Sequence, residues 1–260
     1  MYIAETNSTN TLLRRLYLDE DDLFTIYTDF QTAGRGQQGN GWESEKGKNL
    51  LFSTLLREWH IPVTCQFLIN QIVSLSLYYT VRAFLTEDLQ PFLAIKWPND
   101  LYYKDKKLAG ILIENIWQTG QVSRSIAGIG LNVNQTVFCS QAPNPVSLCQ
   151  IAGHEMNRQD ILQLFLQSLL HYRSLMNDPS YCSLDADIHS AYMRALYRRE
   201  GFYRWEEREV SSLPTMPQMT HTSNQFLASI HAVLPSGELV LLTTDNQQRI
   251  YHFKQVRYVL

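Results

Sequence analysis

Two strand-like segments joined by a short polar turn constrain the fold more than any other feature of the sequence. Residues 93–103 and 108–116 are rich in apolar and aromatic side chains, and the turn KDKK lies between them. This pattern predicts a β-hairpin, and residues 123–135 predict a further strand directly after it. Consecutive strands of this kind favour an antiparallel or mixed sheet over a doubly wound parallel sheet.

Helices are interspersed irregularly among the strands. Apolar side chains at helical spacing predict four helices, over 8–18, 64–88, 158–177 and 183–200. Two more strands are predicted over 24–31 and 49–58. The expected fold class is therefore α+β, with a mixed or antiparallel sheet flanked by helices.

The C-terminal part of the chain changes character. From about residue 201 it contains short β-like runs, over 226–234, 238–244 and 249–260, with a Pro-Ser-Gly turn at 235–237. Short strands at close spacing predict a small barrel or SH3-like module. We therefore predict two domains, 1–199 and 200–260.

Composition argues against several function classes. The net charge is −3, and we find neither a basic stripe nor a DNA-binding motif, so no nucleic-acid partner is expected. The N-terminus lacks the pattern of a signal peptide, and no stretch reaches the roughly 18 apolar residues of a membrane helix. The four cysteines form no CxxC pair and lie at no metal-ligand spacing from a histidine. A cytoplasmic protein with free thiols and no membrane partner is the expectation.

A glycine-rich loop, GRGQQGNGW at 34–42, follows the strand predicted over 24–31. Its glycines let the backbone approach a ligand and present N–H groups to an anion. Arg35 adds a planar fork suited to carboxylate or phosphate. The spacing is neither that of a P-loop nor that of the dinucleotide fingerprint. Taken alone, the loop is equally compatible with a flexible surface loop.

The segment KWPND at 96–100 places a lysine, an amide and a carboxylate at the end of an apolar strand. A hairpin would bring Lys107 on the returning strand near Asn99. There its ammonium could neutralise charge that develops on a phosphoryl or carboxylate oxygen. The alternatives are a hairpin with unrelated polar side chains and, for Lys104 and Lys106, a solvated turn.

The strand GIGLNVN at 128–134 contains two glycines and two amides. Glycine inside a strand marks either the close approach of a ligand or a bulge. Asn132 carries an amide that could hydrogen-bond the edge of a nucleotide base.

In this order, the segments resemble the catalytic domain of biotin–protein ligases. The resemblance rests on Ser8-Thr9-Asn10, Gln31 before the GRG loop, KWPND, KLAGIL at 107–112 and GLNVN at 130–134. It is strong over 5–135 and weaker towards the end, where the family usually carries an SH3-like domain. It implies a class II synthetase-like catalytic domain. It also implies a ligase that uses ATP to activate biotin as biotinyl-5'-AMP and transfers biotin to a lysine of a biotin carboxyl carrier protein.

The resemblance also implies roles for single residues. Lys107 and Arg35 match the catalytic cations, and Asp100 is a candidate for organising Mg²⁺ or Lys96. Biotin contacts are implied for Ser8, Thr9, Asn10, Gln31, Gly34, Arg35, Gly36, Gln37, Lys107 and Gly110. Nucleotide contacts are implied for Arg35, Trp42, Lys107 and Asn132. ATP, biotin and Mg²⁺ are the implied ligands, and the protein ligands of the metal stay unassigned.

The chain departs from the family pattern at Gln37, where many members carry arginine. A neutral amide lacks the charge-assisted hydrogen bonds of arginine to a phosphate, so weaker retention of the adenylate is expected. Asn40 likewise stands where a basic residue is frequent. The chain begins a few residues before the catalytic domain, so the N-terminal helix-turn-helix of some relatives is not expected. The family includes both monomers and homodimers, and the sequence does not choose between them.

Two other functions compete with this interpretation. A lipoate–protein ligase-like acyl-adenylate transferase shares the fold and the chemistry, although KWPND with KLAG favours biotin. A non-catalytic biotin-binding module is the second alternative, against which Lys107 and Arg35 argue. A transcriptional repressor is disfavoured by the acidic net charge.

Overall fold

The computed structural model describes residues 1–36, 41–139, 144–177, 184–208 and 224–259. A seven-stranded sheet forms its larger part, in the order β1-β2-β3-β7-β6-β5-β4. Its strands are β1 Tyr2–Thr6, β2 Thr25–Gln31, β3 Leu50–Pro62, β4 Leu93–Lys96, β5 Asp100–Tyr103, β6 Lys106–Gln118 and β7 Gln121–Leu131. The pair β1 and β2 is parallel and the other neighbouring pairs are antiparallel, which confirms the expected mixed sheet.

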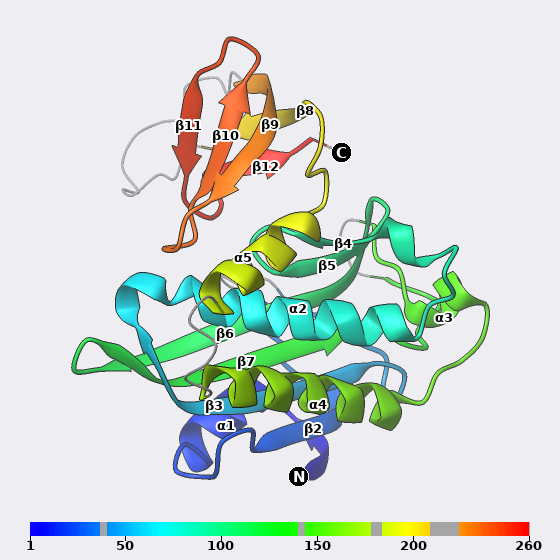
Figure 1. Cartoon of the computed structure of the whole chain (residues 1–260). Helices are drawn as coiled ribbons and strands as arrows, with labels where there is room; N and C mark the ends of the chain where they lie inside the picture. The colour runs from blue at the N-terminus through cyan, green and yellow to red at the C-terminus, as the bar shows by residue number, and fades with distance from the viewer. Residues whose placement is uncertain (37–40, 140–143, 178–183, 209–223, 260) are drawn as a thin grey trace, which may run out of the picture.

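Helices cover both faces of this sheet (Figure 1). The helices are α1 Thr9–Leu16, α2 Phe67–Ala83, α3 Leu148–Ala152, α4 Arg158–Met176 and α5 Leu184–Arg194. The helices α2 and α4 lie side by side over one face, where the main core forms. On the other face, Leu13 of α1 packs with Ile26, Leu55 and Ile126 in a small separate core. The central strands are therefore buried on both faces. Since successive residues of a strand point to opposite faces, alternate residues face α1.

Several elements differ from the sequence predictions. The segment 93–103 is not one strand, because Trp97–Asn99 turn the chain between β4 and β5. Proline has no N–H to donate to a ladder, so a strand does not continue through Pro98. β1 and α3 were not predicted, and the helix predicted over 183–200 ends at Arg194.

A five-stranded antiparallel sheet forms the C-terminal part, in the order β11-β10-β9-β8-β12. Its strands are β8 Tyr203–Glu207, β9 Gln225–Val233, β10 Leu239–Thr243, β11 Gln248–Tyr251 and β12 Val256–Tyr258. This sheet agrees with the expected SH3-like module. The boundary between 199 and 200 stays a prediction, and it falls between α5 and β8.

The two sheets share one continuous core of buried side chains. Trp97, at the turn after β4, donates its indole N–H to the carbonyl of Gly237 at 3.0 Å, across the seam. Arg199 donates to the Ile230 carbonyl at 2.7 Å. These contacts hold the C-terminal sheet against the turn that contains KWPND. Among the described residues, no helix has the length and apolar character needed to cross a membrane.

Candidate active site

Two adjoining cavities lie on the larger sheet, the inner one over its central strands β3, β7 and β6. The inner cavity is lined by the start of α1, by Gln31, by the stem of the glycine-rich loop, and by β6 and β7. The outer cavity, of about 1340 Å³, lies between the larger sheet and the C-terminal sheet. Trp42, Asp100 and Lys107 line both, so the two cavities form one candidate site.

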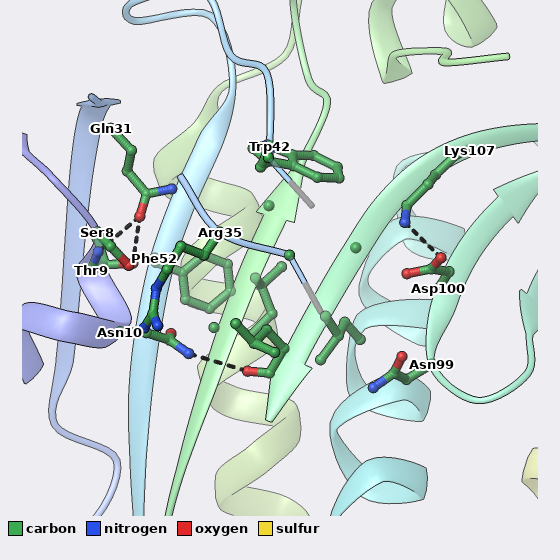
Figure 2. A pocket seen from close by; sticks show the side chains of 18 of the residues that line it. Ser8, Thr9, Asn10, Gln31, Arg35, Trp42, Phe52, Asn99, Asp100 and Lys107 are labelled. Atoms are coloured by element: carbon green, nitrogen blue, oxygen red, sulfur yellow. Dashed lines mark hydrogen bonds and ion pairs between the residues drawn. The ribbon is translucent and has the colours of Figure 1, made fainter. Parts of the chain in front are cut away.

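The N-terminus of α1 supplies a cluster of buried polar groups. Ser8 caps the helix, with its hydroxyl accepting from the Thr11 N–H at 3.5 Å. The Thr9 N–H donates to the Gln31 side-chain carbonyl at 2.8 Å, which joins the helix to the end of β2 (Figure 2). The structure thus brings together Ser8, Thr9 and Gln31, which are three of the predicted biotin contacts.

Asn10 lies against the sheet in a place that only glycine leaves open. A Cβ built on Gly128 would lie 2.0 Å from the Asn10 side-chain oxygen. That oxygen accepts from Ser53 Oγ at 2.5 Å, while the Asn10 amide donates to Glu114 at 2.9 Å. Ser53 and Gly128 are cross-strand partners, so both face α1. Gly128 therefore marks the close approach of a protein side chain.

The ring of Trp42 lies on a second glycine platform. Gly110 and Gly130 are partners on β6 and β7. A Cβ on Gly110 would lie 2.9 Å from that ring, and a Cβ on Gly130 would lie 2.4 Å from it. The Lys107 ammonium is 5.8 Å from the ring centroid. The buried indole N–H donates no hydrogen bond within the described residues. No bulge occurs at Gly128 or Gly130, so the bulge alternative is wrong here.

The stem of the glycine-rich loop forms a short ladder. The Trp42 N–H donates to the Gly34 carbonyl at 3.0 Å, and a bridge pairs Arg35 with Gly41. Arg35 and Gly36 line the inner cavity. Gln37 and Asn40 lie outside the described residues, so the predicted departure at Gln37 stays a prediction.

Arg35 has an acidic partner that the sequence analysis did not single out. One guanidinium nitrogen lies 3.6 Å from a Glu114 oxygen, and Arg35 is 46% exposed. Glu114 also lies 3.4 Å from Arg14. An exposed pair of this kind contributes little stability. A ligand carboxylate can therefore compete with Glu114 for Arg35.

Lys107 and Asp100 meet across the β5–β6 hairpin, as the hairpin hypothesis required. The ammonium lies 2.6 Å from a carboxylate oxygen, and both side chains are about 30% exposed (28% and 30%) (Figure 2). In the ladder Lys107 is the partner of Tyr102, next to a register shift between Leu101 and Tyr102, so the Lys107 side chain reaches Asp100 diagonally across the hairpin. The pair leaves an ammonium in a partly open cavity, held by a single carboxylate.

A second lysine lies deeper beside this pair. The Lys96 ammonium donates to the Tyr102 hydroxyl at 3.0 Å and lies 4.4 Å from that ring's centroid. Burial lowers the pKa of Lys96 to about 8, against the opposing attraction of Asp100. Lys96 thus keeps its charge at neutral pH but holds it at a cost.

Asn132 lies in the wall of the outer cavity, buried to 3% exposure. Its side-chain amide donates to the Val146 carbonyl at 3.1 Å, and its backbone carbonyl accepts from the Leu148 N–H at 3.1 Å. The amide donor therefore holds the segment at 146–148. The predicted role in base recognition depends on the side-chain oxygen.

The carboxylates that the structure describes do not form a ready metal site. No three His, Cys, Asp or Glu side chains gather closely enough to hold an ion, within the described ranges. Asp100 is the one acidic side chain of the described residues that lines the inner cavity. A single carboxylate still suits Mg²⁺, which commonly takes one or two carboxylates together with substrate phosphate oxygens.

Sequence reasoning missed the residues whose role depends on distant pairing. Ser53 and Glu114 have no unusual local pattern, yet they hold Asn10 and face Arg35. Phe253 and Lys254 of the C-terminal part line both cavities. No local signal in the sequence marks these two as cavity residues.

Comparison with known proteins agrees with this geometry. The model of the Biotin/lipoate A/B protein ligase family matches residues 2–132. Biotin–protein ligase 1, chloroplastic, of Arabidopsis thaliana is 29% identical over 229 residues, which are 86% of this chain and 57% of that protein. A biotin–[acetyl-CoA-carboxylase] ligase of Mycobacterium tuberculosis is 30% identical over 171 residues, covering 64% of this chain and 61% of that one. The chain thus spans less than two thirds of these relatives.

Solved structures show the same fold over the whole chain. The biotin protein ligase from Aquifex aeolicus in complex with biotin and ATP superposes with a TM-score of 0.73 at 20% identity. The superposition covers 100% of this chain and 98% of that one, so the likeness includes the C-terminal sheet.

Proposed function

This chain belongs to the Biotin/lipoate A/B protein ligase family, and on that premise we propose that it is an ATP-dependent biotin–protein ligase. It would join biotin to ATP as biotinyl-5'-AMP with release of pyrophosphate. It would then transfer the biotinyl group to a lysine of a biotin carboxyl carrier protein. The relatives named above are called biotin ligases, which supports biotin over lipoate.

One observation carries the proposal. Three regions far apart in the sequence, 8–10, 31–42 and 100–110, line one inner cavity with predicted site residues, among them Asn10, Gln31, Arg35, Asp100 and Lys107. Two of the cations in its lining, Arg35 and Lys107, each lie beside a single carboxylate. A cavity with this lining suits a ligand that ends in an anion.

The first step brings two anions together. A biotin carboxylate oxygen would form a bond to the α-phosphorus of ATP, and the bond from that phosphorus to the bridging oxygen of pyrophosphate would break. Lys107 and Arg35 would offset the repulsion and the charge that develops on the phosphoryl oxygens. Asp100 holds the Lys107 ammonium at 2.6 Å, so that cation is positioned before substrates bind.

Asp100 would also be the protein's contribution to a magnesium site. Its carboxylate, together with phosphate oxygens of ATP, could hold Mg²⁺, which would neutralise the leaving pyrophosphate. The lining of the cavity fits this arrangement, since Asp100 lies in both cavities.

The polar groups at the start of α1 suit the other end of biotin. Ser8, Thr9 and Asn10 are buried, and Gln31 joins them, so an amide-like ring would find donors and acceptors away from water. Gly36 would let the backbone approach the ligand. Gly34 and Gly110 are proposed contacts from the sequence resemblance, since Trp42 takes the space that a side chain at either position would fill. Gln37 completes the proposed set from the sequence resemblance.

Trp42 and Asn132 are the proposed nucleotide contacts. Both line the outer cavity, and the indole N–H is buried without an acceptor in the described part of the chain. Such a buried donor favours a ligand that supplies an acceptor. The indole ring also offers a face on which an adenine base could stack.

Release of pyrophosphate from ATP tests the proposal. The purified chain is incubated with biotin, with lipoate, and with neither. Release that depends on biotin alone is expected. Release with lipoate alone would keep the adenylation chemistry and overturn the substrate. Release in neither case would favour the non-catalytic binding module, and transfer of labelled biotin to a biotin carboxyl carrier domain then tests the second step.

A further inference from the structure

The turn between β11 and β12 brings a lysine of the C-terminal sheet to the candidate site. Phe253 and Lys254 line both cavities, together with Asp100 and Lys107. Lys254 adopts a φ of 72°, a backbone conformation that favours glycine. A side chain therefore stands at this turn although the backbone there would suit a residue without one.

The KWPND segment anchors this turn. Trp97 is 5% exposed, and its ring packs edge-on against Phe253 with centroids 5.8 Å apart. The same indole donates to the Gly237 carbonyl at 3.0 Å. A Cβ on Gly237 would lie 2.7 Å from the ring of Phe67 in α2, so the neighbouring turn at 235–237 also fits closely against the larger domain. The seam thus holds Lys254 over the cavities.

Lys254 differs from Arg35 and Lys107, the two predicted catalytic cations, in having no acidic partner. Arg35 faces Glu114, and Lys107 faces Asp100, whereas no ion pair joins Lys254 to a carboxylate in the described ranges. Arg208, another residue of the outer cavity, has no such pair within those ranges either. Burial, and then repulsion by Arg208, lower the pKa of Lys254. Two unpaired cations near each other are a site for an anion.

The charge of the expected substrate fits this position. Arg35 and Lys107 lie by the inner cavity, where the proposed reaction joins the carboxylate to the α-phosphorus. The remaining phosphates of ATP must extend from there into the outer cavity. In a chain of net charge −3, local cations are needed to hold such a polyanion.

We propose that Lys254 of the C-terminal sheet binds the β- and γ-phosphates of ATP, and hence the leaving pyrophosphate. This inference rests on the proposed ligase function. It gives the C-terminal sheet a direct part in nucleotide binding, and it gives Trp97 a positioning role through the turn that carries Lys254.

The test compares Lys254→Gly with Lys104→Gly. Lys104 is the matched control, because it also lies at a turn with positive φ, 52°, and lines neither cavity. Glycine suits both backbones, so both variants should fold, and thermal unfolding checks this. For Lys254→Gly, the KM for ATP should rise roughly tenfold, as expected for one charge-assisted contact partly open to water. The KM for biotin should change less than about twofold on the same scale.

Inhibition locates the contact along the nucleotide. Added inorganic pyrophosphate should inhibit Lys254→Gly several-fold more weakly than the unaltered protein, whereas inhibition by AMP should not change. Lys254→Arg should retain most of the affinity for ATP. An unchanged KM for ATP and unchanged pyrophosphate inhibition in Lys254→Gly would overturn the inference.

Binding of α,β-methylene-ATP, measured by calorimetry, separates this inference from the proposed function. Weaker binding to Lys254→Gly than to Lys104→Gly would support the phosphate contact even if biotin triggered no pyrophosphate release. Equal binding to the two variants would refute the contact while leaving the ligase reaction standing. No binding to the unaltered protein would refute both.

Discussion

Replacing Gly128 with alanine is expected to destabilise the fold and weaken biotin binding together. The new Cβ would lie 2.0 Å from the side-chain oxygen of Asn10 and 2.6 Å from its Cγ. Asn10 is 4% exposed and belongs to the first turn of α1, which packs on the sheet, so its side chain has little room to retreat. The alanine therefore displaces Asn10 from its place on the sheet.

The size of the effect follows from the hydrogen bonds that Asn10 makes. It accepts from Ser53 at 2.5 Å and donates to Glu114 at 2.9 Å. A neutral hydrogen bond contributes about 1 kcal/mol and one to a charged group about 1.5–3 kcal/mol. Alanine lowers the entropy of the unfolded chain, which offsets about 0.4–1 kcal/mol. A net loss of about 2–3 kcal/mol in the free energy of unfolding is expected.

Urea denaturation measures this loss, and Gly41→Ala is the control. A Cβ on Gly41 would meet nothing within 4 Å, and the φ of Gly41 is not positive. The free energy of unfolding of Gly41→Ala should therefore change by less than about 0.5 kcal/mol. Calorimetry of biotin binding is the second readout, and Gly128→Ala should bind more weakly. Equal stability of the two variants would show that Asn10 is not packed on Gly128 as described.

Three further predictions address the charged groups. Lys107→Ala should lower single-turnover adenylate formation about 100-fold or more while leaving the fold intact; a normal yield would contradict its role, and exposed Lys106→Ala is the control. The buried Lys96 has a pKa lowered to about 8 from its ordinary 10.5, so it penalises folding below pH 8 and the penalty fades as pH rises towards 10.5. Relative to Lys96→Met, the unaltered protein should thus gain up to about 3 kcal/mol in denaturant unfolding between pH 8 and pH 10.5; parallel stability curves would contradict this. Gln37→Arg, a prediction from the family pattern alone, should slow the dissociation of biotinyl-5'-AMP, and an unchanged dissociation rate would count against it.

The sequence patterns predicted the secondary structure where period and length agree. The long helices α2 and α4 and the strands β2, β3, β6 and β7 follow from apolar spacing. The split of 93–103 was open to prediction from Pro98, because proline cannot continue a ladder. β1 was missed because its five residues are mostly exposed and carry no clear alternation.

For the candidate site, local motifs identified the residues that contribute chemistry but not those that hold them. Lys107 and Asp100 are seven residues apart, so a hairpin hypothesis was enough to bring them together. Glu114 meets Asn10 from 104 residues away, and no local pattern records that pairing. The glycines of β6 and β7 were recognised as unusual, but the side chains that cover them were not.

The sequence by itself therefore determined the family, the mixed α+β architecture and the set of ionic groups available for chemistry. Tertiary structure alone decided what those groups face. The register that pairs Gly110 with Gly130 creates the platform beneath Trp42, and the seam at Trp97 brings Lys254 to the cavities. The physical reason is that register and domain packing depend on burial summed over contacts between distant segments, whereas a local motif reflects only the conformational and chemical preferences of its own residues.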